Sequence, residues 1–140
     1  MVLTWAVHRL NGICAPTSAG ASAIDLEKQV VTSRSKVLFT CTALLPKAVQ
    51  AAKAAGIPEH HVYLLDSGNK NGDASPKSVD DLVSEGMKEP PLDSLRWEAG
   101  QGARQVAFLC FSSGTSGPPV RSTCLITSLS MCLRPIRKES

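Results

Sequence analysis

Apolar positions recur with helical spacing in several parts of the chain. A first helix is predicted at residues 2–10, where the apolar side chains share one stripe and Gly12 is the expected stop. A second helix is predicted at about residues 23–33, because Ser22 and Asp25 have the spacing of an acidic variant of a capping box. Both segments therefore carry a local signal for where a helix ends or begins.

Two further helices are predicted downstream. Residues 44–55 are rich in Ala, place their larger apolar side chains on one face and precede Gly56, which is the expected stop. Residues 79–85 form a short amphipathic pattern that opens after Ser78 and is closed by Gly86. The pattern of the chain therefore predicts short helices, each with its own start or stop signal.

Three apolar runs without alternation lie between these helices, at residues 36–41, 61–66 and 105–111. Continuous apolar runs of this length are typical of strands that are buried on both faces of a parallel sheet. Because they alternate with helices, we predict an α/β fold, a partial parallel sheet of three or four strands flanked by helices.

The last part of the chain, residues 120–140, breaks this pattern. It is rich in Ser, Thr, Cys and Arg, its apolar residues follow neither period, and residues 134–138 form a basic cluster. We predict a divergent, disordered tail, and we prefer a solvated end to a site for an acidic surface.

Composition narrows the class of protein. The chain has 140 residues, of which 43% are hydrophobic and 19% charged, so it is one globular domain at most or a piece of a larger one. The net charge is +3, and the last seven residues contribute three basic and one acidic side chain, or +2 of it. The remainder is near neutral, so we expect no nucleic acid partner, and no apolar run reaches the ~20 residues of a membrane helix.

The cysteines point to a reducing compartment. Five of them stand at wide spacing without a C-x-x-C pair, which favours thiols over a disulfide framework. The first residues lack the charged and apolar regions of a signal peptide, so the expected location is cytoplasmic.

The strongest candidate for chemistry is the loop that follows the third predicted strand. Residues 112–119 read Ser-Ser-Gly-Thr-Ser-Gly-Pro-Pro, with two glycines three positions apart and four hydroxyls before the prolines. Such a loop can turn successive backbone N–H groups toward one anion, and hydroxyls add donors. By composition alone an ordinary loop is the preferred interpretation, and the segment lacks the G-K-[ST] of a Walker motif.

This loop and its context resemble the adenylate-forming acyl-CoA synthetases, the AMP-binding family, especially their fungal 4-coumarate–CoA ligase-like branch. The phosphate loop of that family reads roughly [ST]-S-G-[ST]-[ST]-G-x-P-K-G, and residues 112–117 and Pro119 match it. The segments HRLNGI (8–13), LFTC (38–41) and QGARQVAFLCF (101–111) are also similar to that branch. The resemblance covers about residues 1–119, which we therefore expect to form a partial adenylation domain, an incomplete half of a synthetase N-terminal domain.

The resemblance implies a function. Family members use ATP and Mg²⁺ to convert a carboxylic acid, aromatic or fatty, into an acyl adenylate, from which CoA then displaces AMP. A role in fungal secondary metabolism is expected from the branch. The positions implied to contact the ATP phosphates are Ser112, Ser113, Gly114, Thr115, Ser116 and Gly117.

The chain departs from the family where the motif should continue. Val120 stands where the family has a lysine and Arg121 where it has a glycine. The adenine and acyl pockets, the magnesium ligand and the catalytic lysine, which the family places later, have no counterpart in this chain. We therefore expect a truncated chain that is inactive alone, and a frame shift or mis-called splice just after Gly117 would explain the foreign tail. The alternative is a non-catalytic remnant or interaction module that binds a partner such as a larger synthetase.

Other polar residues have simpler interpretations. His60 and His61 lack further ligands for a metal and are predicted to lie in a surface loop, so no metal site is expected. His8 is predicted to lie on a helix face. Asp80 and Asp81 are expected as acids in the first turn of a helix, and Cys110 is expected in the core.

Overall fold

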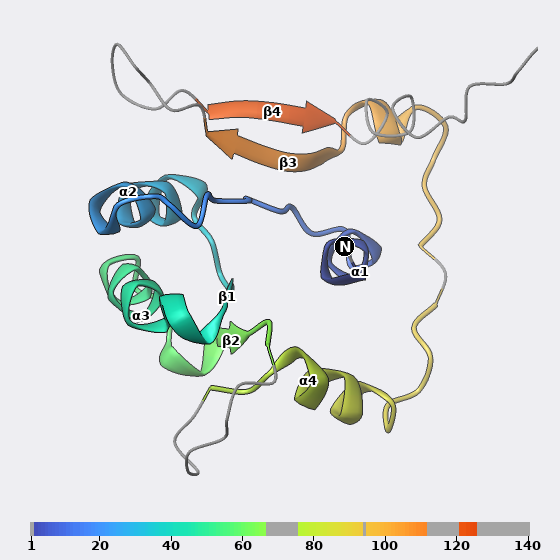
Figure 1. The fold of residues 1–140 in the computed structure, drawn as a ribbon. Helices are drawn as coiled ribbons and strands as arrows, with labels where there is room; N and C mark the ends of the chain where they lie inside the picture. Colours follow the sequence, from blue (N-terminus) through green and yellow to red (C-terminus); the bar gives the residue numbers. More distant parts are fainter. Residues whose placement is uncertain (1, 67–75, 94, 112–120, 126–140) are drawn as a thin grey trace, which may run out of the picture. The chain divides into compact units, whose positions relative to one another are not determined.

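The computed structural model describes residues 2–66, 76–93, 95–111 and 121–125, with backbone alone for the last segment. The chain divides into two compact units, one of Met1–Pro16 with Asp93–Ser140 and the other of Thr17–Leu92. Helix α1 (Val2–Arg9) and strands β3 (Val106–Phe111) and β4 (Arg121–Leu125) belong to the first unit. The other α-helices and β-strands of the described residues belong to the second unit, and Figure 1 labels the α-helices and β-strands of both.

The second unit is built on a parallel pair of short strands, β1 (Leu38–Thr40) and β2 (Val62–Leu64). Phe39 and Tyr63 are partners in this pair, and their rings stack with centroids 5.4 Å apart. These half-buried rings lie on one face of the pair, whereas the buried side chains of both strands belong to the other face. Both strands lie inside the runs predicted as parallel.

Helices α2 (Ala23–Ser33) and α3 (Leu45–Ala54) form the core of this unit with the strands. Helix α3 connects β1 to β2 and packs on both, and α2 packs against α3. The Ser22 hydroxyl accepts a hydrogen bond from the Asp25 N–H, so α2 begins where its cap predicted. The predicted α/β class, a small parallel sheet flanked by helices, is confirmed. The buried core consists of Val30, Ala51, Ala52, Ile57 and Val62, against which Leu26, Leu38, Leu45 and Ala55 pack.

Helix α4 (Val79–Gly86) follows a return of the chain to the sheet. The Leu64 N–H donates to the Lys77 carbonyl at 2.9 Å, and Leu64 and Ser78 form a parallel bridge. Ser78 then begins α4 with a reciprocal capping box. The Ser78 hydroxyl accepts from the Asp81 N–H, and the Asp81 carboxylate accepts from the Ser78 N–H. The first-turn position predicted for Asp80 and Asp81 is confirmed.

Helices α1, α2 and α3 end in the same way. A residue with positive φ follows each helix, and the N–H of the next residue returns to a carbonyl of the last helical turn. The residues with positive φ are Asn11 (60°), Arg34 (53°) and Gly56 (69°). The returning hydrogen bonds run from Gly12 to Val7, from Ser35 to Val30 and from Ile57 to Ala52.

Two of the predicted glycine stops mark where their helices end but do not have a positive φ. Asn11 takes the positive φ after α1, and Gly12 is needed instead for a close approach, since an added Cβ would lie 2.8 Å from Val7 Cγ1. Gly86 is the last residue of α4 and has no positive φ, so that helix ends without a left-handed glycine. The stop at Gly56 is confirmed.

Strand β3 differs from its prediction in its partners. It pairs antiparallel with β4, and on its other edge Cys14 forms a parallel bridge with Phe108. Within the described residues it therefore belongs to a different sheet from β1 and β2. The apolar run could predict burial but not which strand lies beside it.

The segment after Val120 was predicted to be irregular, but the structure places β4 at Arg121–Leu125. A strand that pairs along one edge requires only backbone N–H and C=O groups, so the Ser, Thr and Arg of this segment do not prevent it. Residues 126–140 of the predicted tail lie outside the described residues. Of the helices that the structure describes, none has the length and apolar character needed to cross a membrane.

Candidate functional site

The predicted phosphate loop lies between two strands that are paired at its ends. Ser112, Ser113, Gly114, Thr115, Ser116 and Gly117 themselves fall outside the described residues. Phe111, the last residue of β3, is the ladder partner of Arg121, the first residue of β4. The described residues on either side of residues 112–120 are therefore partners in one sheet.

Strand β3, which leads into the loop, is held by backbone bonds to the segment after α1. The Cys14 N–H donates to the Ala107 carbonyl at 2.9 Å, and the Leu109 N–H donates to the Cys14 carbonyl at 2.8 Å. The Ala107 carbonyl also accepts from His8 Nε2 at 3.1 Å. Ala107 is fully buried, so these bonds lie where water does not compete.

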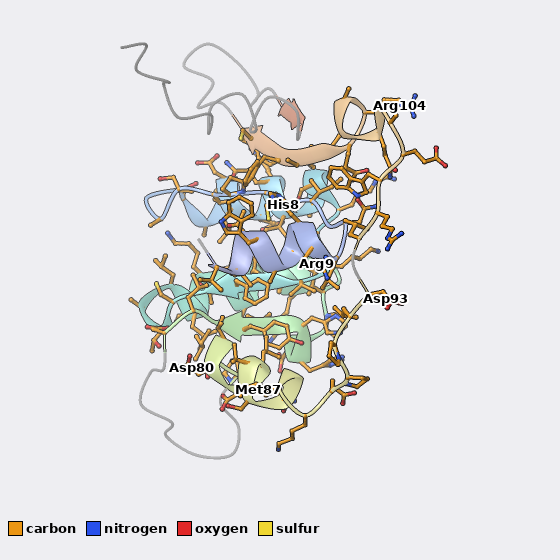
Figure 2. The ribbon with its side chains drawn as sticks, turned by 90° about the vertical axis from the view of Figure 1, so that its right-hand side faces the viewer. His8, Arg9, Asp80, Met87, Asp93 and Arg104 are labelled. Atoms are coloured by element: carbon orange, nitrogen blue, oxygen red, sulfur yellow. The ribbon has the colours of Figure 1, made fainter. Side chains whose placement is uncertain are left out.

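His8 is on the α1 face turned toward β3, as Figure 2 shows, and its ring meets that of Phe108 edge-on with centroids 5.0 Å apart. The prediction of a helix-face histidine is consistent with this position. Sequence reasoning did not identify the bond to Ala107, because the two residues are 99 positions apart and neither periodicity nor a motif links them.

Asp66, which follows β2 after Leu65, has a structural role. Both its carboxylate oxygens accept from the Thr42 N–H, at 3.0 and 3.2 Å, where a short 3-10 turn (Thr42–Leu44) leads into α3. This carboxylate therefore occupies the positive end of the helical segment. The carboxyl ends of β1 and β2 are joined to each other by this contact.

The histidine pair does not form a metal centre. His60 and His61 lie in a 3-10 turn, Glu59–His61, with ring centroids 4.4 Å apart. No group of three or more His, Cys, Asp or Glu side chains capable of holding a metal exists in the part of the chain that the structure describes. No described residue is therefore assigned as a magnesium ligand.

Burial raises the pKa of the half-buried Cys14 thiol, which favours its neutral form. Lys77 hydrogen-bonds both oxygens of Glu85, at 2.7 and 3.0 Å, and this bond raises the pKa of the lysine. Its contribution to stability is present at neutral pH and is lost as the pH rises through the raised pKa. The pair is exposed and serves to tie the start of α4 to its end.

One open cavity lies in the second unit where α2 and α3 end. Its volume is about 260 Å³, and its walls combine apolar side chains with two basic ones. It offers no carboxylate, histidine or thiol among its lining residues, so it lacks groups for acid–base or nucleophilic chemistry. The lining residues are Val30, Val31, Arg34, Ser35, Lys36, Ala54 and Ala55.

Comparison with protein families identifies one match. The model of the family described as AMP-binding enzyme matches residues 1–119. This is the range over which the sequence resembles the adenylate-forming synthetases, and the match ends at Pro119.

Several curated fungal proteins are similar to the chain. The acyl-CoA ligase cm3C of Cordyceps militaris is 39% identical over 123 residues, which cover 83% of this chain and 19% of the relative. The acyl-CoA ligase easD of Emericella nidulans is 38% identical over 120 residues, covering 82% and 21%. The chain thus spans about a fifth of the length of the curated relatives it matches.

Solved structures share the fold. The anthranilate CoA ligase AuaEII in complex with anthranoyl-AMP superposes with a TM-score of 0.68 at 18% identity, covering 88% of this chain and 22% of that one. The N-terminal domain of FACL13 from Mycobacterium tuberculosis, with a bound inhibitor, gives a TM-score of 0.60 at 20% identity, covering 91% and 28%. The arrangement of elements described above is therefore that of part of such an N-terminal domain.

Proposed function

Since this chain belongs to the family of AMP-binding enzymes, we propose that it carries the phosphate-loop portion of an acyl-CoA ligase. The complete reaction uses ATP to convert a carboxylic acid into an acyl adenylate and then forms a CoA thioester. The curated relatives bear the name of acyl-CoA ligases, and one solved neighbour holds anthranoyl-AMP, an adenylated aromatic acid. An aromatic or fatty carboxylic acid is therefore the proposed substrate class.

The observation that carries this proposal is the pairing of Phe111 with Arg121, the described residues on either side of residues 112–120. The sequence between them matches the family's phosphate loop through Gly117. Glycines without Cβ let backbone N–H groups approach an anion, and the hydroxyls of Ser112, Ser113, Thr115 and Ser116 supply further donors. The loop is proposed to hold the phosphates of ATP during adenylation.

We also propose that these 140 residues do not catalyse adenylation by themselves. Val120 replaces the lysine that faces the triphosphate in the family, and loss of such a charge-assisted hydrogen bond removes about 1.5–3 kcal/mol. Enzymes lower their barriers by at least ~8 kcal/mol, which a neutral loop does not reach without a metal ligand or an adenine pocket. Weak binding of ATP, with a Kd near ~1 mM, is the activity expected of this chain.

The boundary at Pro119 is part of the proposal. The family match ends there, so residues 1–119 are proposed to be the partial adenylation domain and residues 120–140 a divergent segment.

The second candidate is a non-catalytic remnant that keeps only the phosphate loop. Val120, which stands in place of the family's lysine, is the residue that favours it. Cytoplasmic location, secondary metabolism and association with a larger synthetase stay predictions.

An ATP titration followed by NMR tests the loop. We expect the amide shifts to cluster at residues 112–117 and to be lost in Gly114→Val, because a side chain there blocks the approach of the phosphates. Gly20→Val is the matched control, since Gly20 is exposed and an added Cβ meets nothing closer than 3.7 Å. Shifts that cluster elsewhere, or that survive Gly114→Val, contradict the assignment.

Pyrophosphate exchange with a panel of aromatic and fatty acids tests the reaction. We expect no exchange above background for the 140-residue chain. Exchange that depends on one of the acids would show that the residues present suffice for adenylation and would overturn the proposal of an inactive chain.

A further inference from the structure

The strand that enters the proposed phosphate loop is irregular at one residue. Val106 pairs with Leu125 and Phe108 with Cys124, so Ala107 is an extra residue on β3 opposite β4. An extra residue of this kind is a β-bulge, which bends the strand and increases its twist. The direction in which β3 delivers Phe111 to the loop therefore depends on the conformation at Ala107.

The bulged residue is held from its other side by two donors. The Ala107 carbonyl accepts from the Cys14 N–H at 2.9 Å and from His8 Nε2 at 3.1 Å. The first bond belongs to the bridge between Cys14 and β3, but the second comes from a side chain on α1. Since a carbonyl only accepts, Nε2 is the protonated nitrogen of His8 in this contact.

The His8 ring also restricts the next residue of the strand. It meets the Phe108 ring edge-on, at 5.0 Å and 83°, so one side chain contacts both the bulge and the position after it. A single imidazole thus supplies a directional hydrogen bond and an aromatic contact to a buried segment. Figure 2 shows His8 on α1 beside β3.

We propose that His8 is a positioning residue, which fixes the bulge of β3 at Ala107 and thereby sets the strand end that carries the nucleotide-phosphate loop. This inference rests on the proposed function for the loop itself. His8 acts through the strand and does not touch the nucleotide. Its role is the geometry of Phe111, the last described residue before the loop.

Three variants of the 140-residue chain test this role. His8→Phe keeps a flat ring beside Phe108 and removes the donor, whereas His8→Gln retains an N–H that can reach the carbonyl. Ala6→Gln changes an exposed residue of the same helix and is the control. We expect His8→Phe to weaken ATP binding by about 3- to 10-fold, the effect of one lost hydrogen bond, and His8→Gln to restore most of it.

Measurements of stability and of hydrogen exchange distinguish a positioning role of His8 from a purely structural one. We expect His8→Phe to raise amide exchange in residues 108–111 while its urea midpoint stays close to that of Ala6→Gln. Unchanged exchange together with unchanged ATP affinity overturns the proposal. Weaker binding that His8→Gln does not restore also overturns it, because the hydrogen bond would then not be the cause.

A measurement on the unmodified chain keeps the proposal testable if His8→Phe does not fold. The imidazole ¹⁵N shifts of His8 at neutral pH distinguish a protonated Nε2 from a protonated Nδ1. Protonation at Nε2 supports the proposal, and a neutral ring protonated only at Nδ1 overturns it. If the unmodified chain shows no ATP-dependent shifts at residues 112–117, the proposed function fails, while exchange in β3 still decides whether His8 holds the bulge.

Discussion

Gly56 and Gly86 are chemically identical but stand in opposite backbone conformations. Gly56 follows α3 with a φ of 69°, a region that L side chains enter with strain. Gly86 is the last residue of α4 with ordinary helical geometry, where glycine is a poor helix former. An added Cβ meets nothing within 4 Å at either position. A difference between the two Gly→Ala variants therefore reflects backbone conformation and not side-chain packing.

We therefore predict opposite effects of the same substitution. Gly56→Ala should lower the free energy of unfolding by about 1 kcal/mol, because the strain of a positive φ exceeds the gain from a stiffer unfolded chain. Gly86→Ala should raise it by about 0.5 kcal/mol. Urea denaturation of the two variants side by side measures both, and equal signs would contradict the assigned backbone conformations.

Val120 is the residue whose change should matter most for ATP. We predict that Val120→Lys tightens ATP binding by at least about tenfold, since a charge-assisted hydrogen bond to phosphate contributes about 1.5–3 kcal/mol. Val120→Gln has a similar length without the charge and should stay near the unmodified affinity. Isothermal titration compares the ATP affinities of the three chains at one salt concentration. Equal affinities would contradict the assignment of position 120 to the end of a phosphate-binding loop.

At the scale of elements, β1 and β2 are joined at their carboxyl ends by one side chain. Asp66 accepts both of its hydrogen bonds from the Thr42 N–H, which is the start of the helical segment that continues into α3. A carboxylate at this position satisfies a backbone donor that has no partner within the helix and complements the helix dipole.

Removal of this cap should destabilise the second unit. We expect Asp66→Ala to lower the free energy of unfolding by about 1 kcal/mol, and Asp66→Asn, which keeps an acceptor, to lower it by less. Denaturation followed by far-UV circular dichroism measures this, because α2, α3 and α4 lie in that unit. If both variants lose the same stability, the charge and not the hydrogen bond carries the effect.

At the scale of the whole molecule, buried apolar residues are unevenly shared between the two units. Within the described residues, Ala107 is the one buried apolar residue of the first unit, whereas seven belong to the second. Trp5 and Trp97 both lie in the first unit, and Trp5 is 59% exposed. Tryptophan fluorescence therefore reports on the unit with the smaller buried core.

We predict that the two units unfold separately in urea. The tryptophan transition should have a lower midpoint than the far-UV dichroism transition, because a small buried core supports less stability. Trp97→Phe should remove most of the fluorescence change and leave the dichroism curve unchanged. Coincident transitions would instead show that the isolated chain folds as one cooperative unit.

Much of the second unit could be predicted from the sequence because its signals are local. Ser22 with Asp25 and Ser78 with Asp81 mark where α2 and α4 begin, and these bonds join residues three positions apart. The apolar runs that contain β1 and β2 are short and continuous, so burial on both faces was the simplest interpretation. After α1 the positive φ falls on Asn11 and not on the predicted stop, Gly12, and the close approach of Gly12 to Val7 is a contact that no local pattern shows.

The candidate loop stays a prediction, which rests on its resemblance to the family's phosphate loop, since glycines and hydroxyls alone also occur in ordinary loops. The sequence by itself therefore determined the family and the positions of most of the described elements, and it predicts the phosphate-binding chemistry of residues 112–117. Tertiary structure alone decided the partners of β3, the bulge at Ala107 and the bond from His8. Those features join residues far apart in the chain, and their bonds form only after the backbone has brought a donor and a buried carbonyl together.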